Sequence, residues 1–123
     1  MSNAKHTITD SEYSIMKILW NSEKKMTVSD VVDALDGNDW TPSTVSTFLQ
    51  RLLKKNVVSC EKKGNTNLYY PILKQNDYDM SETESFLSKI YKGSVKNLVA
   101  ALYENKKLSK EDMSELKSMF DLE

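Results

Sequence analysis

The most informative segment of the chain reads WTPSTVSTFLQRLLKK, residues 40–55, and it combines several helix signals. Thr41 suits an N-cap, because its hydroxyl can accept a hydrogen bond from the first helical turn. Pro42 follows at the first helical position, where no N–H is needed and φ is already helical. Apolar residues then recur at the spacing that gives a helix one buried face. The segment predicts a helix ending near residues 55–56, with an inward stripe of Val45, Phe48, Leu49 and Leu52.

Two further helices are predicted upstream of this segment. Thr9 with Glu12 has the spacing of a capping box, and Thr27 with Asp30 indicates a second helix start. Gly37 suits the left-handed position that ends the second helix, while the first is expected to end near residue 21. The two stripes are Tyr13, Met16, Leu19 and Trp20, and then Val28, Val31, Val32 and Leu35.

After residue 56 the apolar spacing changes from helical to alternating, which predicts two strands around a turn at residues 62–67. Pro71 has no N–H to donate, so the second strand lies at an edge or ends there. Three helices followed by such a hairpin are the plan of a winged helix-turn-helix, and the predicted fold class is mainly α. The residues expected to face inward are Val58, Cys60, Leu68, Tyr70 and Ile72.

The last third of the chain is predicted to be helical. Residues 74–80 are polar and are expected to form a linker, with helices beyond it that begin at Ser81, at Val95 and at Ser109. Short amphipathic helices in so small a segment cannot cover their own apolar stripes. We therefore expect a helical dimerisation region over residues 75–123, in which a second copy contacts Phe86, Ile90, Leu98, Leu102, Leu116 and Phe120.

The composition offers little for catalysis. One cysteine, one histidine and three glycines supply neither a Cys–His or Ser–His pair, nor a cysteine-based zinc cluster, nor a phosphate-binding loop. We therefore expect no enzyme, no catalytic residues, no metal site and no cofactor. Because the chain lacks both a run of about 18 apolar residues and a signal-peptide core, we expect it to stay in the cytoplasm without membrane insertion.

Positive charge gathers in the first 74 residues, although the whole chain has a net charge of −1. Those residues hold ten Lys or Arg against eight Asp or Glu, and the rest hold seven against ten. A local basic surface is typical of nucleic-acid binding, so residues 1–74 are predicted to form a DNA-binding domain. Its third helix would enter the major groove and its hairpin would reach the phosphates. The predicted contacts are Ser43, Thr44, Ser46, Thr47, Gln50, Arg51, Lys54, Lys55, Lys62, Lys63, Asn65 and Thr66.

Five stretches of the chain carry residues that are typical of one known family. They are Ser11-Glu12-Tyr13, Ile18-Leu19-Trp20, residues 40–55, Tyr69-Tyr70-Pro71, and Phe86-Leu87 through Tyr91-Lys92-Gly93-Ser94. Together they resemble the penicillinase-repressor (BlaI/MecI) family. The motif W-[TS]-P-x-T-[VI]-x-T-x-L-x-R-L-x-x-K is specific, and the likeness covers almost the whole chain. The resemblance implies a homodimeric transcriptional repressor that binds palindromic, double-stranded operator DNA of antibiotic-resistance genes.

The resemblance also concerns single residues of the third helix. Thr44, Thr47 and Arg51 match positions that contact operator DNA in the family. Ser43 and Ser46 stand where several members carry Lys or Arg, so either a base-reading contact is missing in this chain or its operator differs. The copper-responsive branch carries C-terminal Cys-x-Cys pairs that this sequence lacks, which disfavours that branch.

Release of the repressor is a further implication of the resemblance. In the family's resistance systems a membrane sensor with a cytosolic metalloprotease domain signals antibiotic, and the repressor is cleaved at an Asn-Phe dipeptide. That dipeptide aligns with Ala101-Leu102, which is the candidate cleavage bond of this chain. Since the two residues differ from Asn-Phe, release by a signal other than proteolysis remains an alternative.

Other interpretations stay open. The chain can be an orphan family member that represses an unrelated regulon, such as a metal or stress regulon. The surface around Arg51 and Lys62 can instead dock an acidic protein, and a steep salt dependence with duplex DNA would distinguish the two. A one-component small-molecule sensor would need an apolar pocket between the domains, and no polar cluster in the sequence marks one.

Overall fold

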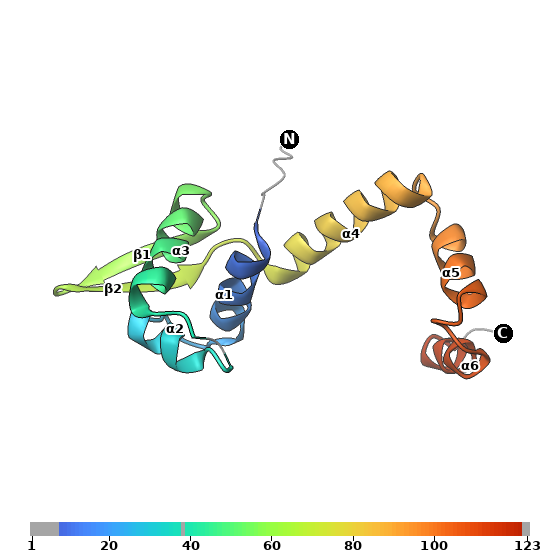
Figure 1. Cartoon of the computed structure of the whole chain (residues 1–123), viewed down its shortest axis with the longest axis horizontal. Helices are drawn as coiled ribbons and strands as arrows, with labels where there is room; N and C mark the ends of the chain where they lie inside the picture. Colours follow the sequence, from blue (N-terminus) through green and yellow to red (C-terminus); the bar gives the residue numbers. More distant parts are fainter. Residues whose placement is uncertain (1–7, 38, 122–123) are drawn as a thin grey trace. The chain divides into compact units, whose positions relative to one another are not determined.

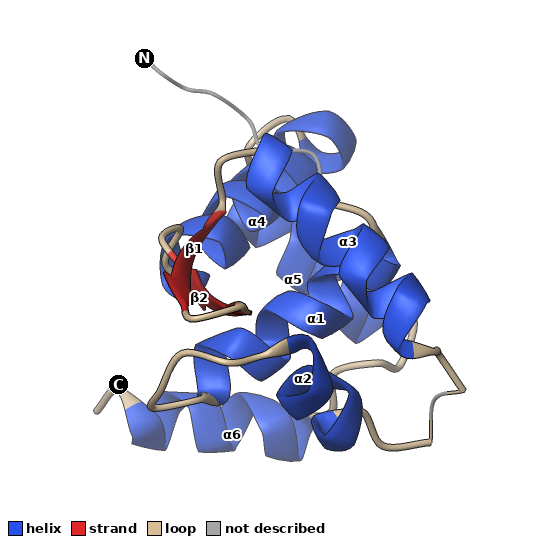
Figure 2. Ribbon diagram, turned by 90° about the vertical axis from the view of Figure 1, so that its left-hand side faces the viewer, coloured by secondary structure: helices blue, strands red, loops and turns tan. Residues whose placement is uncertain are grey.

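The computed structural model describes residues 8–37 and 39–121. Helices make up most of it, and the described part contains one two-stranded antiparallel sheet (Figure 2). The first elements along the chain are α1 (Asp10–Asn21), α2 (Val28–Ala34), α3 (Pro42–Lys54), β1 (Val58–Lys63) and β2 (Thr66–Pro71), with the hairpin extending away from the three helices (Figure 1). The remaining helices are α4 (Gln75–Tyr91), α5 (Val95–Glu104) and α6 (Lys110–Met119).

The first three helices begin where the sequence predicts. Thr9 Oγ1 accepts a hydrogen bond from the Glu12 N–H at 3.2 Å, and Glu12 Oε1 accepts one from the Thr9 N–H at 3.0 Å. Thr27 and Asp30 exchange the same two bonds at 3.0 and 3.1 Å. Thr41 caps α3. These bonds satisfy N–H groups that have no partner inside the helix, so the caps stabilise each start.

The end of α2 differs from the prediction. Gly37 has the expected left-handed φ of 71°, but the helix stops three residues earlier, at Ala34. Leu35 is already in an extended conformation, with its N–H donating to the carbonyls of Val31 and Val32. The glycine therefore turns the loop that follows α2 rather than ending the helix.

The apolar faces of α1, α2 and α3 meet the base of the hairpin and form the core of the first compact unit, residues 1–79. Most members of this core lie on the predicted stripes, so the periodicity identified the buried side of each helix. The fold is the predicted mainly α winged helix-turn-helix. The buried apolar residues are Ile15, Met16, Leu19, Met26, Val31, Val45, Leu49, Leu52, Val57, Val58 and Tyr69.

Strand β2 turns a different side towards the core from the one predicted. Alternation put Leu68, Tyr70 and Ile72 inward, and this was wrong: Tyr69 is 1% exposed, whereas Ile72 is 55% exposed. Tyr69 lies opposite Cys60 of β1. It also exchanges backbone hydrogen bonds with Met26, at 2.7 and 2.9 Å. This pairing with a distant segment fixes the strand, and nothing in the local pattern indicates it.

The sequence suggested a linker at residues 74–80, and this was wrong. The helix α4 already begins at Gln75. Its first turns pack on α1 through aromatic rings: Tyr78 lies 5.8 Å from Tyr13 and 6.3 Å from Trp20, between ring centroids. The Tyr13 hydroxyl donates to Asp79 Oδ1 at 2.9 Å. The Trp20 Nε1–H donates to the Leu73 carbonyl at 2.7 Å. The polar stretch is therefore anchored by tertiary contacts.

The second compact unit comprises residues 80–123, of which residues 80–121 are described. Ser94 caps α5, and Ser109 with Asp112 forms a capping box at the start of α6. Neither α5 nor α6 contains a buried residue, and α4 buries only Tyr78, which belongs to the first unit. The helices of this unit therefore form without a core of their own.

Candidate nucleic-acid interface

One face of α3 is exposed along the whole helix. Ser43, Thr47, Gln50, Arg51 and Lys54 lie on it, at a spacing that keeps them on one side, and all five are exposed. The opposite side carries the buried stripe of Val45, Leu49 and Leu52. We call these five exposed residues the recognition face.

The start of α3 is rich in hydroxyl groups. Thr41 Oγ1 accepts from the Thr44 N–H and donates to Thr44 Oγ1, both at 3.2 Å. Thr47 Oγ1 donates to the Ser43 carbonyl at 3.1 Å. Thr44 and Ser46 are half-buried at the edges of the recognition face. Small side chains at a helix N-terminus allow a close approach to a phosphate.

The middle of α3 carries its two longest polar groups. The guanidinium of Arg51 lies 5.8 Å from the centroid of the Phe48 ring, and that ring packs 5.0 Å from Trp40. Gln50 Nε2 donates to the Tyr69 hydroxyl at 3.3 Å, which joins α3 to β2. The first contact supports an arginine that is otherwise exposed, and the second connects the recognition face to the hairpin.

The tip of the hairpin is exposed and basic. Lys63 of β1 is opposite Thr66 of β2, and the turn between them contains Gly64, whose φ of 66° favours glycine. Lys62, Lys63, Asn65 and Thr66 are all exposed, and we call these four residues the wing tip.

Lys55 differs from the other predicted contacts because it is paired inside the protein. Its ammonium donates to Glu12 Oε1 of α1, whose side chain is 1% exposed. Burial raises the pKa of the Glu12 carboxyl, but the hydrogen bonds from Lys55 and Thr9 outweigh it and hold the pKa below its ordinary value of 4.5. This pair was not predicted, because the sequence pattern indicates only that Glu12 takes the capping-box position beside Thr9. The bond ties the end of α3 to the start of α1.

Lys25 and Glu61 form a second pair, beside the hairpin, that the sequence does not indicate. Lys25 donates to Glu61 of β1 and lies 4.5 Å from the centroid of the Tyr70 ring. The hydrogen bond from Lys25 lowers the pKa of Glu61, and the hydrogen bond to Glu61 raises the pKa of Lys25. Among the described residues, no salt bridge joins a carboxylate to Arg51, Lys54, Lys62 or Lys63, although the charge of Lys63 also helps to lower the pKa of Glu61.

The second unit presents the residues that were predicted to mediate dimerisation. Phe86 is 50% exposed, Ile90 53% and Phe120 63%. Leu102 and Leu116 are also exposed, and Leu98 is half-buried. The described residues of this unit thus leave large apolar side chains exposed on successive helices.

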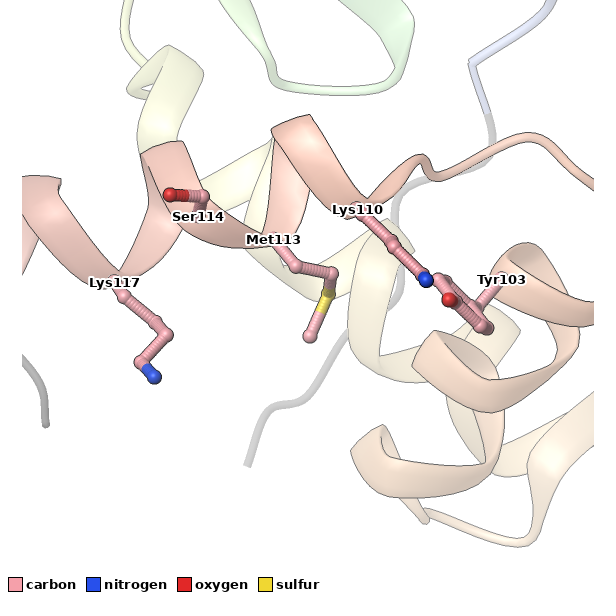
Figure 3. A pocket seen from close by; sticks show the side chains of 5 residues that line it. All are labelled: Tyr103, Lys110, Met113, Ser114 and Lys117. Atoms are coloured by element: carbon pink, nitrogen blue, oxygen red, sulfur yellow. The ribbon is translucent and has the colours of Figure 1, made fainter.

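A hollow of about 450 Å³ lies between α5 and α6 (Figure 3). Its lining combines the ring of Tyr103 and the thioether of Met113 with two lysines, Lys110 and Lys117. Ser114 completes the lining. None of the six predicted dimer residues lines this hollow.

The candidate cleavage bond lies inside α5. The Ala101 carbonyl accepts from both the backbone N–H and the side-chain amide of Asn105, at 3.1 and 2.8 Å. The Leu102 carbonyl accepts from the N–H groups of Lys107 and Leu108, at 2.8 and 3.1 Å. A protease needs an extended substrate, so these bonds must open before the peptide bond can be cleaved.

Comparison with known proteins identifies the family of this chain. The family model described as "Penicillinase repressor" matches residues 8–121, a range that includes every described residue. The chain belongs to the penicillinase-repressor family. The resemblance seen in the sequence is thereby confirmed, as is the expectation of a transcriptional repressor rather than an enzyme.

Individual relatives agree with this membership. The penicillinase repressor of Bacillus licheniformis is 32% identical over 109 residues, which are 89% of this chain and 85% of that protein. The methicillin resistance regulatory protein MecI of Staphylococcus aureus is 27% identical over 122 residues, 98% of each chain. The solution structure of B. licheniformis BlaI with the blaP half-operator matches with a TM-score of 0.50 and 32% identity, over 58% of this chain and 88% of that one.

Two further observations concern membranes and metals. None of the helices in the described ranges is long and apolar enough to span a bilayer. Over the same residues, His, Cys, Asp and Glu side chains nowhere gather in a group of three or more that could hold a metal ion.

Proposed function

We propose that this protein is a dimeric repressor that binds a palindromic operator through α3 and the wing tip. The observation that carries the proposal is that the recognition face and the wing tip are both exposed, and that their Arg51, Lys54, Lys62 and Lys63 form no salt bridge among the described residues. The related BlaI of B. licheniformis, solved with a half-operator, supports the same use of the fold. A DNA-bound repressor acts where the chromosome is, so we expect the chain in the cytoplasm.

Each part of this surface has a separate role in the proposal. A helix in the major groove reads base edges, and Arg51 can form a bidentate contact with guanine. Lys62 and Lys63 reach the phosphates beside the groove, where they add affinity without sequence preference. Thr47 and Ser43 let the helix start approach the backbone. Lys55 instead holds α3 against α1 through Glu12.

Dimerisation is proposed to reside in residues 75–123, with residues 1–74 as the DNA-binding part. The exposed Phe86, Ile90, Leu102, Leu116 and Phe120 support this, because one copy leaves them in water. Burial of apolar surface contributes about 25 cal/mol per Å², so covering these side chains favours association. A dimer then presents two copies of α3 to two half-sites.

The regulated genes are proposed to be those of β-lactam resistance, as in the relatives named penicillinase repressor and MecI. Release is proposed to occur by cleavage of the Ala101–Leu102 bond by a membrane sensor-protease. The loss of residues 102–123 would remove α6 from the dimer. Each DNA-binding unit would then hold its half-site alone, at lower affinity.

A mobility-shift titration tests DNA binding. The probe is a duplex selected by the wild-type chain from a random-sequence pool, and a scrambled duplex of equal composition is the control. The variant combining Arg51→Ala, Lys62→Ala and Lys63→Ala should lose most binding, with Arg51→Ala alone costing about 1–3 kcal/mol. Equal binding by wild type and triple variant would contradict the proposed interface. Failure of the wild type to select any duplex would favour docking to an acidic protein.

A further inference from the structure

Gln50 connects the recognition face to the interior of the wing. Its side chain is exposed on α3, and its Nε2 donates to the hydroxyl of Tyr69 at 3.3 Å. The Tyr69 residue is only 1% exposed. A phenol held in the core therefore reaches a polar group on the surface that faces DNA in the proposed function.

The position of the Tyr69 hydroxyl is set by tertiary structure. The ring lies in the hydrophobic core, opposite Cys60 in the register of the hairpin. The backbone of Tyr69 donates to and accepts from Met26, at 2.7 and 2.9 Å. Because ring and backbone are both fixed, the hydrogen bond restricts Gln50 as well. A side chain restricted before binding loses less entropy when it binds.

The remaining groups of Gln50 match one base. A glutamine amide has two N–H donors and one carbonyl oxygen, and Tyr69 accepts from one of the donors. One N–H and the oxygen are left, and this is the pair with which glutamine bridges N7 and N6 of adenine in the major groove. An arrangement without Tyr69 would leave the amide free to rotate among several contacts.

We propose that Tyr69 is a positioning residue that orients Gln50 to read an adenine in the operator. This inference rests on the proposed function, since it requires α3 to lie in the major groove. Position 50 is one that the family motif in residues 40–55 leaves open. Gln50 would thus give this chain a base preference of its own beside the contact from Arg51.

The test compares Tyr69→Phe, which removes only the hydroxyl, with Gln50→Leu and with the double variant. Tyr70→Phe is the matched control, because it deletes a hydroxyl from the neighbouring residue of β2. Each variant is titrated with the duplex selected by the wild type, with every single base-pair substitution of it, and with 7-deazaadenine at each adenine. Thermal unfolding followed by circular dichroism verifies that each variant is folded.

The wild type should discriminate about tenfold or more against 7-deazaadenine at one position of each half-site. Tyr69→Phe should lose several-fold of this discrimination there and at no other base pair. Gln50→Leu should lose all of it, the double variant should equal Gln50→Leu, and Tyr70→Phe should behave as wild type.

Three results would overturn the inference while the proposed function stands. The first is a folded Tyr69→Phe variant with unchanged discrimination at every position. The second is an equal weakening on all duplexes, which would mean that the hydroxyl only supports the wing. The third is unchanged base preference in Gln50→Leu. Absence of any sequence preference in the wild type would instead overturn the proposed function, and this inference with it.

Discussion

Glu12 is the one charged side chain among the buried residues of the described chain, and it lies where α1 meets the end of α3. The carboxylate accepts from Lys55 and from the backbone of Thr9, so its burial is compensated by two hydrogen bonds. Because Lys55 lies just after the last turn of α3, the pair fixes the orientation of the helix that carries the recognition face. Its contribution to DNA binding is therefore indirect.

Lys55→Met should lower the free energy of unfolding at neutral pH by about 1.5–3 kcal/mol, because it leaves a buried carboxylate without its charged donor. Lys54→Met, at an exposed neighbouring position, should change it by less than about 0.5 kcal/mol. Since the pKa of Glu12 is lowered, the stabilisation is complete above pH 4.5 and is lost as the pH falls through the folded-state pKa. Urea unfolding at neutral and acidic pH measures the free energy of unfolding of the wild type and of Lys55→Met. A difference between the two that does not become smaller in acid would contradict the prediction.

The two wing lysines should act on affinity and not on specificity. If Lys62 and Lys63 each neutralise a phosphate, removing both should reduce the slope of log K against log salt by about 2. The loss should be the same on selected and scrambled duplexes. Lys24→Ala, an exposed lysine outside the proposed interface, should leave the slope unchanged. Fluorescence anisotropy over a range of salt concentrations measures the slope, and an unaltered slope in the double variant would exclude the wing from phosphate contact.

Among the helices and strands, the sequence predicts the features that depend on residues close together in the chain. The caps at Thr9, Thr27 and Thr41 were predictable because each satisfies N–H groups within its own turn. The inward side of β2 was not, because Tyr69 is fixed by pairing with the distant Met26. The helical start of α4 was also missed, since its anchors are rings of α1 more than 50 residues away along the chain.

The features of the candidate site can also be separated into those that the sequence predicts and those that it does not. Sequence periodicity identified the exposed face of α3, because an amphipathic helix shows both of its faces in its spacing. Composition identified the basic hairpin tip. Lys55 pairs with Glu12, and Lys25 with Glu61, between elements far apart in the sequence, so the local pattern and the count of charges could not predict either pair.

Association should depend on the exposed apolar residues of α5 and α6. Replacing Leu98 and Leu116 by Asp would bury two charges without partners, so the dimer should dissociate while the helix content is mostly kept. The control combines Ala100→Asp and Ser118→Asp, which add the same charges at exposed positions on the other sides of these helices. Sedimentation equilibrium measures the mass. A dimer that survives in the leucine variant would locate the interface outside α5 and α6.

In the whole molecule, association of two chains should raise the affinity for DNA. A chain truncated after Ala101 lacks Leu102 and all of α6, so its DNA-binding units should act separately and the affinity for a palindromic duplex should fall by about 10²-fold or more. Affinity for an isolated half-site should be unchanged, which serves as the internal control. Equal binding of truncated and full-length chains to the palindrome would mean that cleavage at this bond is not the switch.

Cells treated with a β-lactam provide the second half of that prediction. Immunoblotting of the repressor should show a fragment ending near residue 101 when the target genes are switched on. Only full-length protein under those conditions would show that another signal releases the repressor.

Binding of the operator by a dimer is tested most directly with the full-length chain and two duplexes. One is the selected palindromic duplex, and in the other one half is scrambled. The mass and the affinity of each complex are measured. Two chains should bind the intact palindrome, and the affinity should fall by about 10²-fold when one half is scrambled, because both copies of α3 contribute to binding. One chain per duplex, or equal affinity for the two duplexes, would contradict a repressor that binds its operator as a dimer.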